Sequence, residues 1–263
     1  MFKKTILIGL LLLSASLPTA KVVLAGEVSA LVFAVNSPGS PPYAYFDTDS
    51  QSYQGLVRDF FEFTAGHGSF TANYVDSNRS RSEQFLREGK IDMFLANPKW
   101  LKQPEDFIAS TTILSHHSFL YSLNEFPLDF ELAKAAGKRI CTRSGFVYTG
   151  LEDLFNSNVL LRVDSSSQAA MAAMLAKQRC DYAVMNDFNA AVTFSDHSFC
   201  GLSIHQSPLA TSSVDLVFMM RQDMQNIKTL IDAQLQEYIS SGKFDASLAR
   251  HSKGRHFPIL PSC

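Results

Sequence analysis

Hydrophobic and polar positions along the first half of the chain predict strands that alternate with helices. Residues 28–36 are rich in β-branched and aromatic side chains and predict a strand, and residues 70–75 and 91–96 predict two more. Apolar residues recur at helical spacing from Leu56 onward, and residues 80–88 predict a second helix. The order strand-helix-strand-helix-strand predicts a mainly parallel sheet.

The same order repeats in the second half of the chain. Residues 139–142, 159–163 and 182–185 predict strands, and residues 148–155 and 168–178 predict helices between them. The fold class is therefore α/β, with two similar units.

Two extended segments join these units and predict two crossings between two lobes. The final helix, residues 227–239, is apolar on one face and is expected to pack back on the first lobe. The expected boundaries are residues 26–118 with 214–263 for lobe 1, residues 123–208 for lobe 2, and residues 118–123 with 209–220 for the hinge crossings. In open α/β sheets, ligands bind beyond the carboxyl ends of the strands, so those ends should line one cleft between the lobes. The expected strand ends are residues 36–45, 96–100, 142–148 and 186–187.

The first 25 residues predict a signal peptide. Lys3 and Lys4 form a basic start, residues 6–13 are apolar, and a small-residue cleavage site ends at Ala25. The apolar stretch is shorter than the ~20 residues that a membrane-spanning helix needs. The alternative is an uncleaved membrane anchor. We expect an exported, periplasmic protein.

Net charge bears on the class of binding partner, and cysteine content bears on disulfides and metal sites. The net charge of −2 gives no reason to expect nucleic acid or an anionic membrane as partner. The four cysteines, Cys141, Cys180, Cys200 and Cys263, allow three pairings in an oxidising compartment. Cys180–Cys200 is the expected disulfide, because these two residues flank one strand-loop unit. No Cys/His grouping indicates a metal, and we expect no cofactor.

Several sequence segments, taken in their order and spacing, resemble those of one protein family. They are residues 40–47 (SPPYAYFD), 53–61 (YQGLVRDFF), 85–94 (FLREGKIDMF), 179–187 (RCDYAVMND) and 216–221 (LVFMMR). Together they resemble the extracellular solute-binding proteins of family 3, which serve ABC transporters of polar amino acids. The resemblance implies a two-lobed, type II-like periplasmic binding protein that is monomeric and closes on a small molecule by hinge motion. An ABC permease would be its partner; the alternative is a stand-alone sensor that presents its ligand to a membrane signalling protein.

The resemblance also implies three groups of residues that bind an amino acid, and this chain has only one of them unaltered. Asp187 matches the family's aspartate for the α-amino group, with a helix cap or a loop residue as its other interpretation. The family's carboxylate-binding Arg is missing where Asn97 and Lys99 stand, and a Lys supplies a point charge without the planar fork. The family's Gly-Ser/Thr phrase at a helix start is altered to Ser144, preceded by Arg143, which can still supply anion donors.

Aromatic side chains gather at the expected cleft instead. Tyr43, Tyr45, Trp100, Phe146 and Tyr148 all fall in its loops, and Trp100 is the only tryptophan. Aromatic faces suit planar rings, cations or sugars. The alternative for Tyr43 and Tyr45 is that they lie at the edge of the hydrophobic core and do not contact a ligand. The expected ligand is therefore a small polar or aromatic molecule and not a plain α-amino acid.

An enzyme is the competing class, since some relatives on this scaffold are exported lyases. A lyase needs an acid/base pair in the cleft. Glu152 and Asp47 are the possible partners of Asp187, but each is better explained as a helix-start or turn residue. His116 and His117 are adjacent on a strand, so they point to opposite faces and cannot readily share a metal. We therefore expect a binding protein and no catalytic residues.

Overall fold

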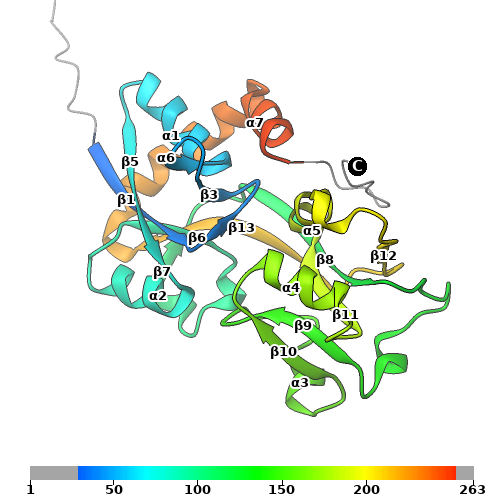
Figure 1. The fold of residues 1–263 in the computed structure, drawn as a ribbon. Helices are drawn as coiled ribbons and strands as arrows, with labels where there is room; N and C mark the ends of the chain where they lie inside the picture. The colour runs from blue at the N-terminus through cyan, green and yellow to red at the C-terminus, as the bar shows by residue number, and fades with distance from the viewer. Residues whose placement is uncertain (1–28, 253–263) are drawn as a thin grey trace, which may run out of the picture.

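The computed structural model describes residues 29–252, so the predicted signal peptide, its cleavage site and Cys263 lie outside the described residues. Figure 1 shows two α/β halves side by side, with two long strands running between them. Ten of the described strands form one sheet, in which the order of its main path is β10-β9-β11-β8-β13-β6-β1-β5.

The first half is built on parallel strands. Strand β1 pairs in parallel with β5 and with β6, as the alternating sequence pattern predicts. The strands are β1 (Ser29–Asn36), β5 (Phe70–Ser77), β6 (Met93–Ala96) and β7 (Phe107–Ala109). The helices are α1 (Leu56–Gly66), α2 (Arg79–Arg87), α6 (Gln225–Ser240) and α7 (Lys243–His251). Tyr238 of α6 packs on Phe60 and Phe63 of α1, which confirms that the helix predicted at 227–239 returns to this half.

The second half repeats the arrangement. Strand β9 pairs in parallel with β10 and with β11. The strands are β9 (Arg139–Arg143), β10 (Leu161–Ser165), β11 (Tyr182–Asn186) and β12 (His205–Gln206). The helices are α3 (Glu152–Asn156), α4 (Gln168–Ala176) and α5 (Asp187–Phe194). The helix predicted at residues 148–155 is wrong at its start, because α3 begins only at Glu152 and residues 144–151 form turns and irregular chain.

Two long strands cross between the halves. Strand β8 (Leu114–Ser122) pairs with β11, and β13 (Ser212–Arg221) pairs with β6. The two strands also pair with each other, antiparallel, from Ser212 opposite Ser118 to Leu216 opposite Leu114. This double crossing makes one continuous sheet of the two halves.

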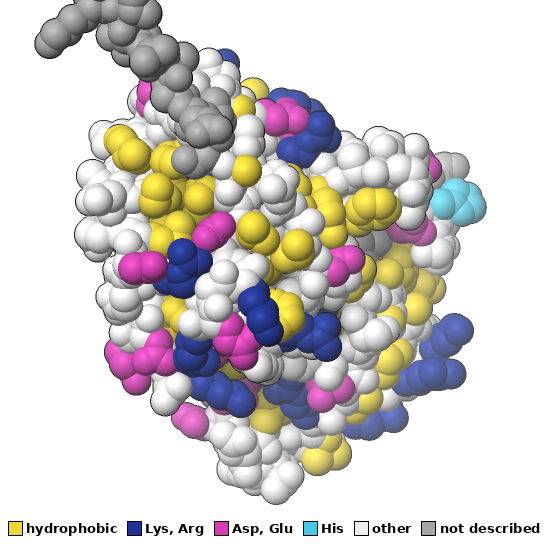
Figure 2. Space-filling view, turned by 90° about the vertical axis from the view of Figure 1, so that its left-hand side faces the viewer, with side chains coloured by type: hydrophobic (Ala, Val, Ile, Leu, Met, Phe, Trp, Pro, Cys, Tyr) yellow, Lys and Arg dark blue, Asp and Glu magenta, His cyan; other side chains and the backbone are white. Residues whose placement is uncertain are grey.

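Smaller elements complete the chain between these strands. A separate sheet of β2 (Gly39–Ser40), β3 (Ala44–Asp47) and β4 (Ser52–Gln54) follows β1. Single 3-10 turns lie at Pro98–Trp100, Pro104–Asp106, Leu132–Ala135, His197–Phe199 and Gln222–Met224. Acidic and basic side chains are interspersed on the face shown in Figure 2, in keeping with the small net charge.

The disulfide differs from the expected one. Cys141 on β9 is bonded to Cys180, which lies two residues before the start of β11, with their Cα atoms 5.6 Å apart. Cys200 is also disulfide-bonded, so the expected Cys180–Cys200 pair is wrong. Sequence proximity suggested that pair, but the parallel pairing of β9 with β11 brings Cys141 next to Cys180.

Candidate functional site

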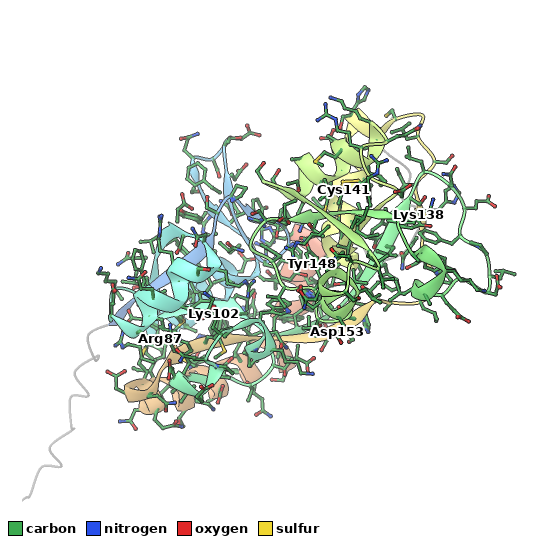
Figure 3. The ribbon with its side chains drawn as sticks, turned by 90° about the horizontal axis from the view of Figure 1, so that it is seen from below. Arg87, Lys102, Lys138, Cys141, Tyr148 and Asp153 are labelled. Atoms are coloured by element: carbon green, nitrogen blue, oxygen red, sulfur yellow. A yellow bond between two sulfur atoms is a disulfide. The ribbon has the colours of Figure 1, made fainter. Side chains whose placement is uncertain are left out.

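A pocket of about 110 Å³ lies between the two halves, where the carboxyl ends of the strands meet. The ends of β1 and β6 contribute from the first half, and the ends of β9 and β11 contribute from the second. Tyr148, labelled in Figure 3, lies where the two halves come together. The size is comparable to a cavity of ~150 Å³ that holds benzene, so the pocket suits a molecule of a few non-hydrogen atoms.

Arg79 is the most unusual side chain of this pocket. It is the first residue of α2, whose start is fixed by the Asn78 side chain accepting from the Arg81 amide at 3.0 Å. Its guanidinium carbon lies 4.7 Å from the ring centre of Trp100 and 5.3 Å from that of Phe146. Trp100 belongs to the first half and Phe146 to the second, so the guanidinium is enclosed between aromatic rings from both.

Two of the three nitrogens of this guanidinium have no hydrogen-bond partner in the described chain. The Nε and Nη1 atoms of Arg79 are fully shielded from solvent and have no hydrogen-bond partner among residues 29–252. Burial lowers the pKa of Arg79 from 12.5 to about 10, while Glu83 raises it and the nearby charge of Arg143 lowers it further. A cation at the first turn of a helix also faces the positive end of the helix dipole.

Arg143 is the second guanidinium of the pocket, and it bridges the halves. Its Nη2 atom donates to the carbonyl oxygens of Asn36 at 3.2 Å and Ser37 at 2.8 Å, at the end of β1. Its guanidinium carbon lies 4.6 Å from the ring centre of Phe146, and burial lowers its pKa. The backbone amide of Arg143 donates to the Tyr148 hydroxyl, whose pKa burial raises to about 12.

A second contact between the halves centres on Tyr43. Its hydroxyl donates to the Asn186 side chain at 3.2 Å and lies 2.7 Å from His116 Nδ1. The His116 ring is stacked on Trp100, with ring centres 6.0 Å apart. Gly55 holds Tyr43 in place, because its φ of 116° lets α1 begin directly against the Tyr43 carbonyl, where a Cβ atom would lie 2.5 Å away.

Five of the ten predicted site residues line the pocket: Tyr43, Trp100, Arg143, Phe146 and Tyr148. The other five have different surroundings. The Tyr45 hydroxyl lies 3.1 Å from the Nδ1 atom of His251. Asn97 caps the following turn and donates to the Asp215 carbonyl at 2.7 Å. Lys99 is exposed.

Ser144 and Asp187 also lie outside the pocket lining. Ser144 is exposed in a turn, and α3 begins eight residues later at Glu152, so the helix start expected beside Ser144 is wrong. Asp187 is the first residue of α5, where it accepts from the amide of Phe188 at 3.0 Å and lies 3.7 Å from His117. The cap of α5 is Asn186, whose side chain accepts from the Asn189 amide at 2.8 Å, so Asp187 is the first helical residue and not the cap.

Sequence reasoning missed Arg79, Gln168 and Asn189, all of which line the pocket. The position of Arg79 after a strand of the parallel sheet is the feature that could have identified it. Residue 79 lies two residues after the end of β5, whose carboxyl end faces the same edge of the sheet as that of β1. The search for an arginine concentrated on residues 97–104, where the family resemblance places it.

Neither metal ligation nor a membrane span is found in the described chain. Residues 29–252 contain no group of three His, Cys, Asp or Glu side chains that could hold a metal ion. No described helix has both the length and the apolar character needed to cross a membrane.

Comparisons with known proteins show the fold. No family model and no curated protein matches the chain. A mutant of ArgBP from T. maritima is 16% identical, with a TM-score of 0.69 over 85% of this chain and 95% of its own. The GluR0 ligand binding core in complex with L-glutamate is 14% identical, with a TM-score of 0.70 over 86% and 100%. AbpA from Streptococcus pneumoniae, an amino acid ABC transporter substrate-binding protein bound to L-arginine, is 15% identical, with a TM-score of 0.66 over 84% and 94%. The predicted two-lobed α/β fold is confirmed.

Proposed function

We propose that the protein is an exported solute-binding protein that captures one small molecule between its two lobes and delivers it to an ABC-type uptake system. The observation that carries the proposal is the pocket itself. Side chains of both halves line it, and Arg143 and Tyr43 each hydrogen-bond from one half to the other around it. The similar structures whose titles name L-arginine or L-glutamate support a small-molecule ligand.

The ligand would act as the contact that favours closure. A molecule that touches both halves binds the closed arrangement better than an open one, and it shifts the equilibrium by that difference in affinity. The two crossing strands β8 and β13 would form the hinge. The proposal includes the domain boundaries predicted from the sequence, which are residues 26–118 with 214–263 for lobe 1 and residues 123–208 for lobe 2.

Titration against a metabolite panel tests the proposal. Trp100 is the only tryptophan and lines the pocket, so a change in intrinsic fluorescence reports on the site directly. At a ligand concentration of ~1,000 Kd, linkage adds about 4 kcal/mol to the free energy of unfolding. For a chain of this size that corresponds to a rise in Tm of roughly 10 °C.

The protein should be unfolded, dialysed and refolded before titration, so that a co-purified molecule does not mask the response. We expect at least one small molecule to change both the fluorescence and the Tm. If a broad panel of sugars, amino acids, organic acids and amines changes neither, the solute-binding proposal is wrong.

A further inference from the structure

The polar lining of the pocket is unbalanced in charge. Arg79 and Arg143 both face it, and among the described residues that line it there is no Asp, Glu or Lys. The carboxylate that acts on Arg79 is Glu83, a buried residue one helical turn later, and the two side chains form no ion pair in the described chain. Two guanidinium groups and one carboxylate leave a net positive charge, which one bound anion would neutralise.

The same lining offers nothing to neutralise an ammonium group. Asp187, which the sequence suggested for this role, is occupied with the Phe188 amide and His117 outside the lining. An amino acid bound here would place its ammonium group beside two guanidinium groups. Like charges so close, in a water-poor site, repel strongly.

Neutral polar atoms in the pocket favour a hydroxyl or carbonyl group on the ligand. The side-chain oxygens of Gln168 and Asn189 are buried and have no hydrogen-bond partner in residues 29–252. Both residues line the pocket from the second half. A side-chain amide can accept from a hydroxyl or, turned over, donate to a carbonyl.

The walls favour an organic body over an inorganic ion. Phe33, Val35, Leu95, Met185 and Leu216 line the pocket together with the aromatic residues already described. Phosphate or sulfate would leave this apolar surface against water, whereas a short carbon skeleton would cover it.

We infer that the ligand is a small organic carboxylate without a cationic group, and that Arg79, enclosed by Trp100 and Phe146, binds its carboxylate. This inference rests on the proposed function, because it describes the ligand of the same pocket. Phe146 comes from the opposite half, so the arginine is enclosed only when the halves are together. Anion binding by Arg79 and closure of the lobes are therefore coupled.

A matched set of ligands tests the chemistry. Butyrate, 2-hydroxybutyrate, 2-aminobutyrate and butyramide share one carbon skeleton and differ only in the groups that the pocket would recognise. They are titrated by calorimetry and Trp100 fluorescence, with benzoate and benzamide as a planar pair, inorganic phosphate, and a panel of amino acids, sugars and larger mono- and dicarboxylic acids. We expect the acids to bind, the amino acid of the matched set to bind at least tenfold more weakly than its parent acid, and the amides not to bind.

Variants assign the contact to Arg79. Arg79→Gln should weaken acid binding ten- to hundredfold, since it removes a charge-assisted contact, and Arg79→Lys should restore only part of it. Arg81→Gln is the matched control, because Arg81 is exposed on the same helix and does not line the pocket. Its affinity should equal that of the wild type.

The outcomes separate the two proposals. If an amino acid, a neutral solute or phosphate binds more tightly than every organic acid, the inference is overturned while the solute-binding function stands. The same holds if an acid binds equally well to wild type and Arg79→Gln. If nothing in the panel binds, the solute-binding proposal fails and the inference fails with it.

Discussion

Arg79→Met should make the unliganded protein more stable in its closed arrangement while it weakens ligand binding. Met matches the aliphatic stem of Arg79 and can pack between Trp100 and Phe146 without carrying a charge. The substitution removes a guanidinium whose Nε and Nη1 atoms are buried and have no hydrogen-bond partner in the described chain. Groups of this kind destabilise a fold unless a partner compensates them.

The size of the gain follows from the pKa. The pKa of Arg79 falls from 12.5 to about 10, and at 1.36 kcal/mol for each pH unit this is roughly 3 kcal/mol. Because the lowered pKa belongs to a base, the cost is present at every pH below about 10 and disappears as the pH rises from there toward 12.5. Losing two cation–π contacts takes back ~0.5–1 kcal/mol each. The net gain is about 1–2 kcal/mol, or a rise in Tm of roughly 3–6 °C for a chain of this size.

Thermal and urea unfolding, followed by circular dichroism at about pH 7, measure the effect. The ligand must first be removed by refolding, since bound ligand would stabilise the wild type alone. Arg81→Met serves as the control and should stay within ~0.5 kcal/mol of the wild type, because Arg81 is exposed. If Arg79→Met lowers the Tm while Arg81→Met does not, the guanidinium stabilises the fold by itself, and the reasoning from burial is refuted.

Three further predictions concern closure, the disulfide and the C-terminal helix. Arg143→Met should weaken ligand binding about tenfold and increase the radius of gyration in X-ray scattering, since it removes the hydrogen bonds across the cleft; equal scattering profiles for variant and wild type would contradict this. Replacing Cys141 and Cys180 with Ala opens a loop of 39 residues and should lower the free energy of unfolding by up to about 4 kcal/mol relative to the oxidised wild type in urea melts; a value equal to that of the oxidised wild type would contradict this. Asp59→Asn should cost roughly 1 kcal/mol at about pH 7. Burial raises the pKa of Asp59, but hydrogen bonds from His251 and Ser247 outweigh it and leave the pKa below 3.8. The loss of stability in Asp59→Asn should therefore shrink as the pH falls through that lowered pKa. A loss of stability that does not change with pH would contradict this role of the Asp59 carboxylate.

Most secondary-structure elements were predictable because their signals are local. The strand at residues 28–36 and the helix starting at Leu56 appear in the structure as β1 and α1. Alternation on β8 also predicted that His116 and His117 face opposite ways, and His116 is buried beside Tyr43 while His117 lies near Asp187. Such patterns depend only on the geometry of one element.

The start of the helix near Tyr148 was not predictable in this way. The Glu152 side chain accepts from the Tyr148 amide at 2.7 Å, and the Arg143 amide donates to the Tyr148 hydroxyl. These contacts hold residues 144–151 in an irregular loop that carries Phe146 into the pocket. Side-chain contacts to the backbone between residues four and five positions apart here override a helical pattern that is four residues too long at its start.

The sequence by itself determined the two α/β units, their joining by two strands, and the cluster of aromatic residues at the strand ends, because periodicity and the topology of parallel sheets fix these. Only the tertiary structure decided the rest. It pairs Cys141 with Cys180, directs Asp187 to the start of α5, and buries Arg79 under rings that are distant in sequence. The stretch Asn78-Arg79-Ser80-Arg81 has the composition of a solvated helix start, and nothing local distinguishes Arg79 from Arg81. Burial and the missing hydrogen-bond partners are properties of the packed chain, and they are what mark Arg79 as the anion site.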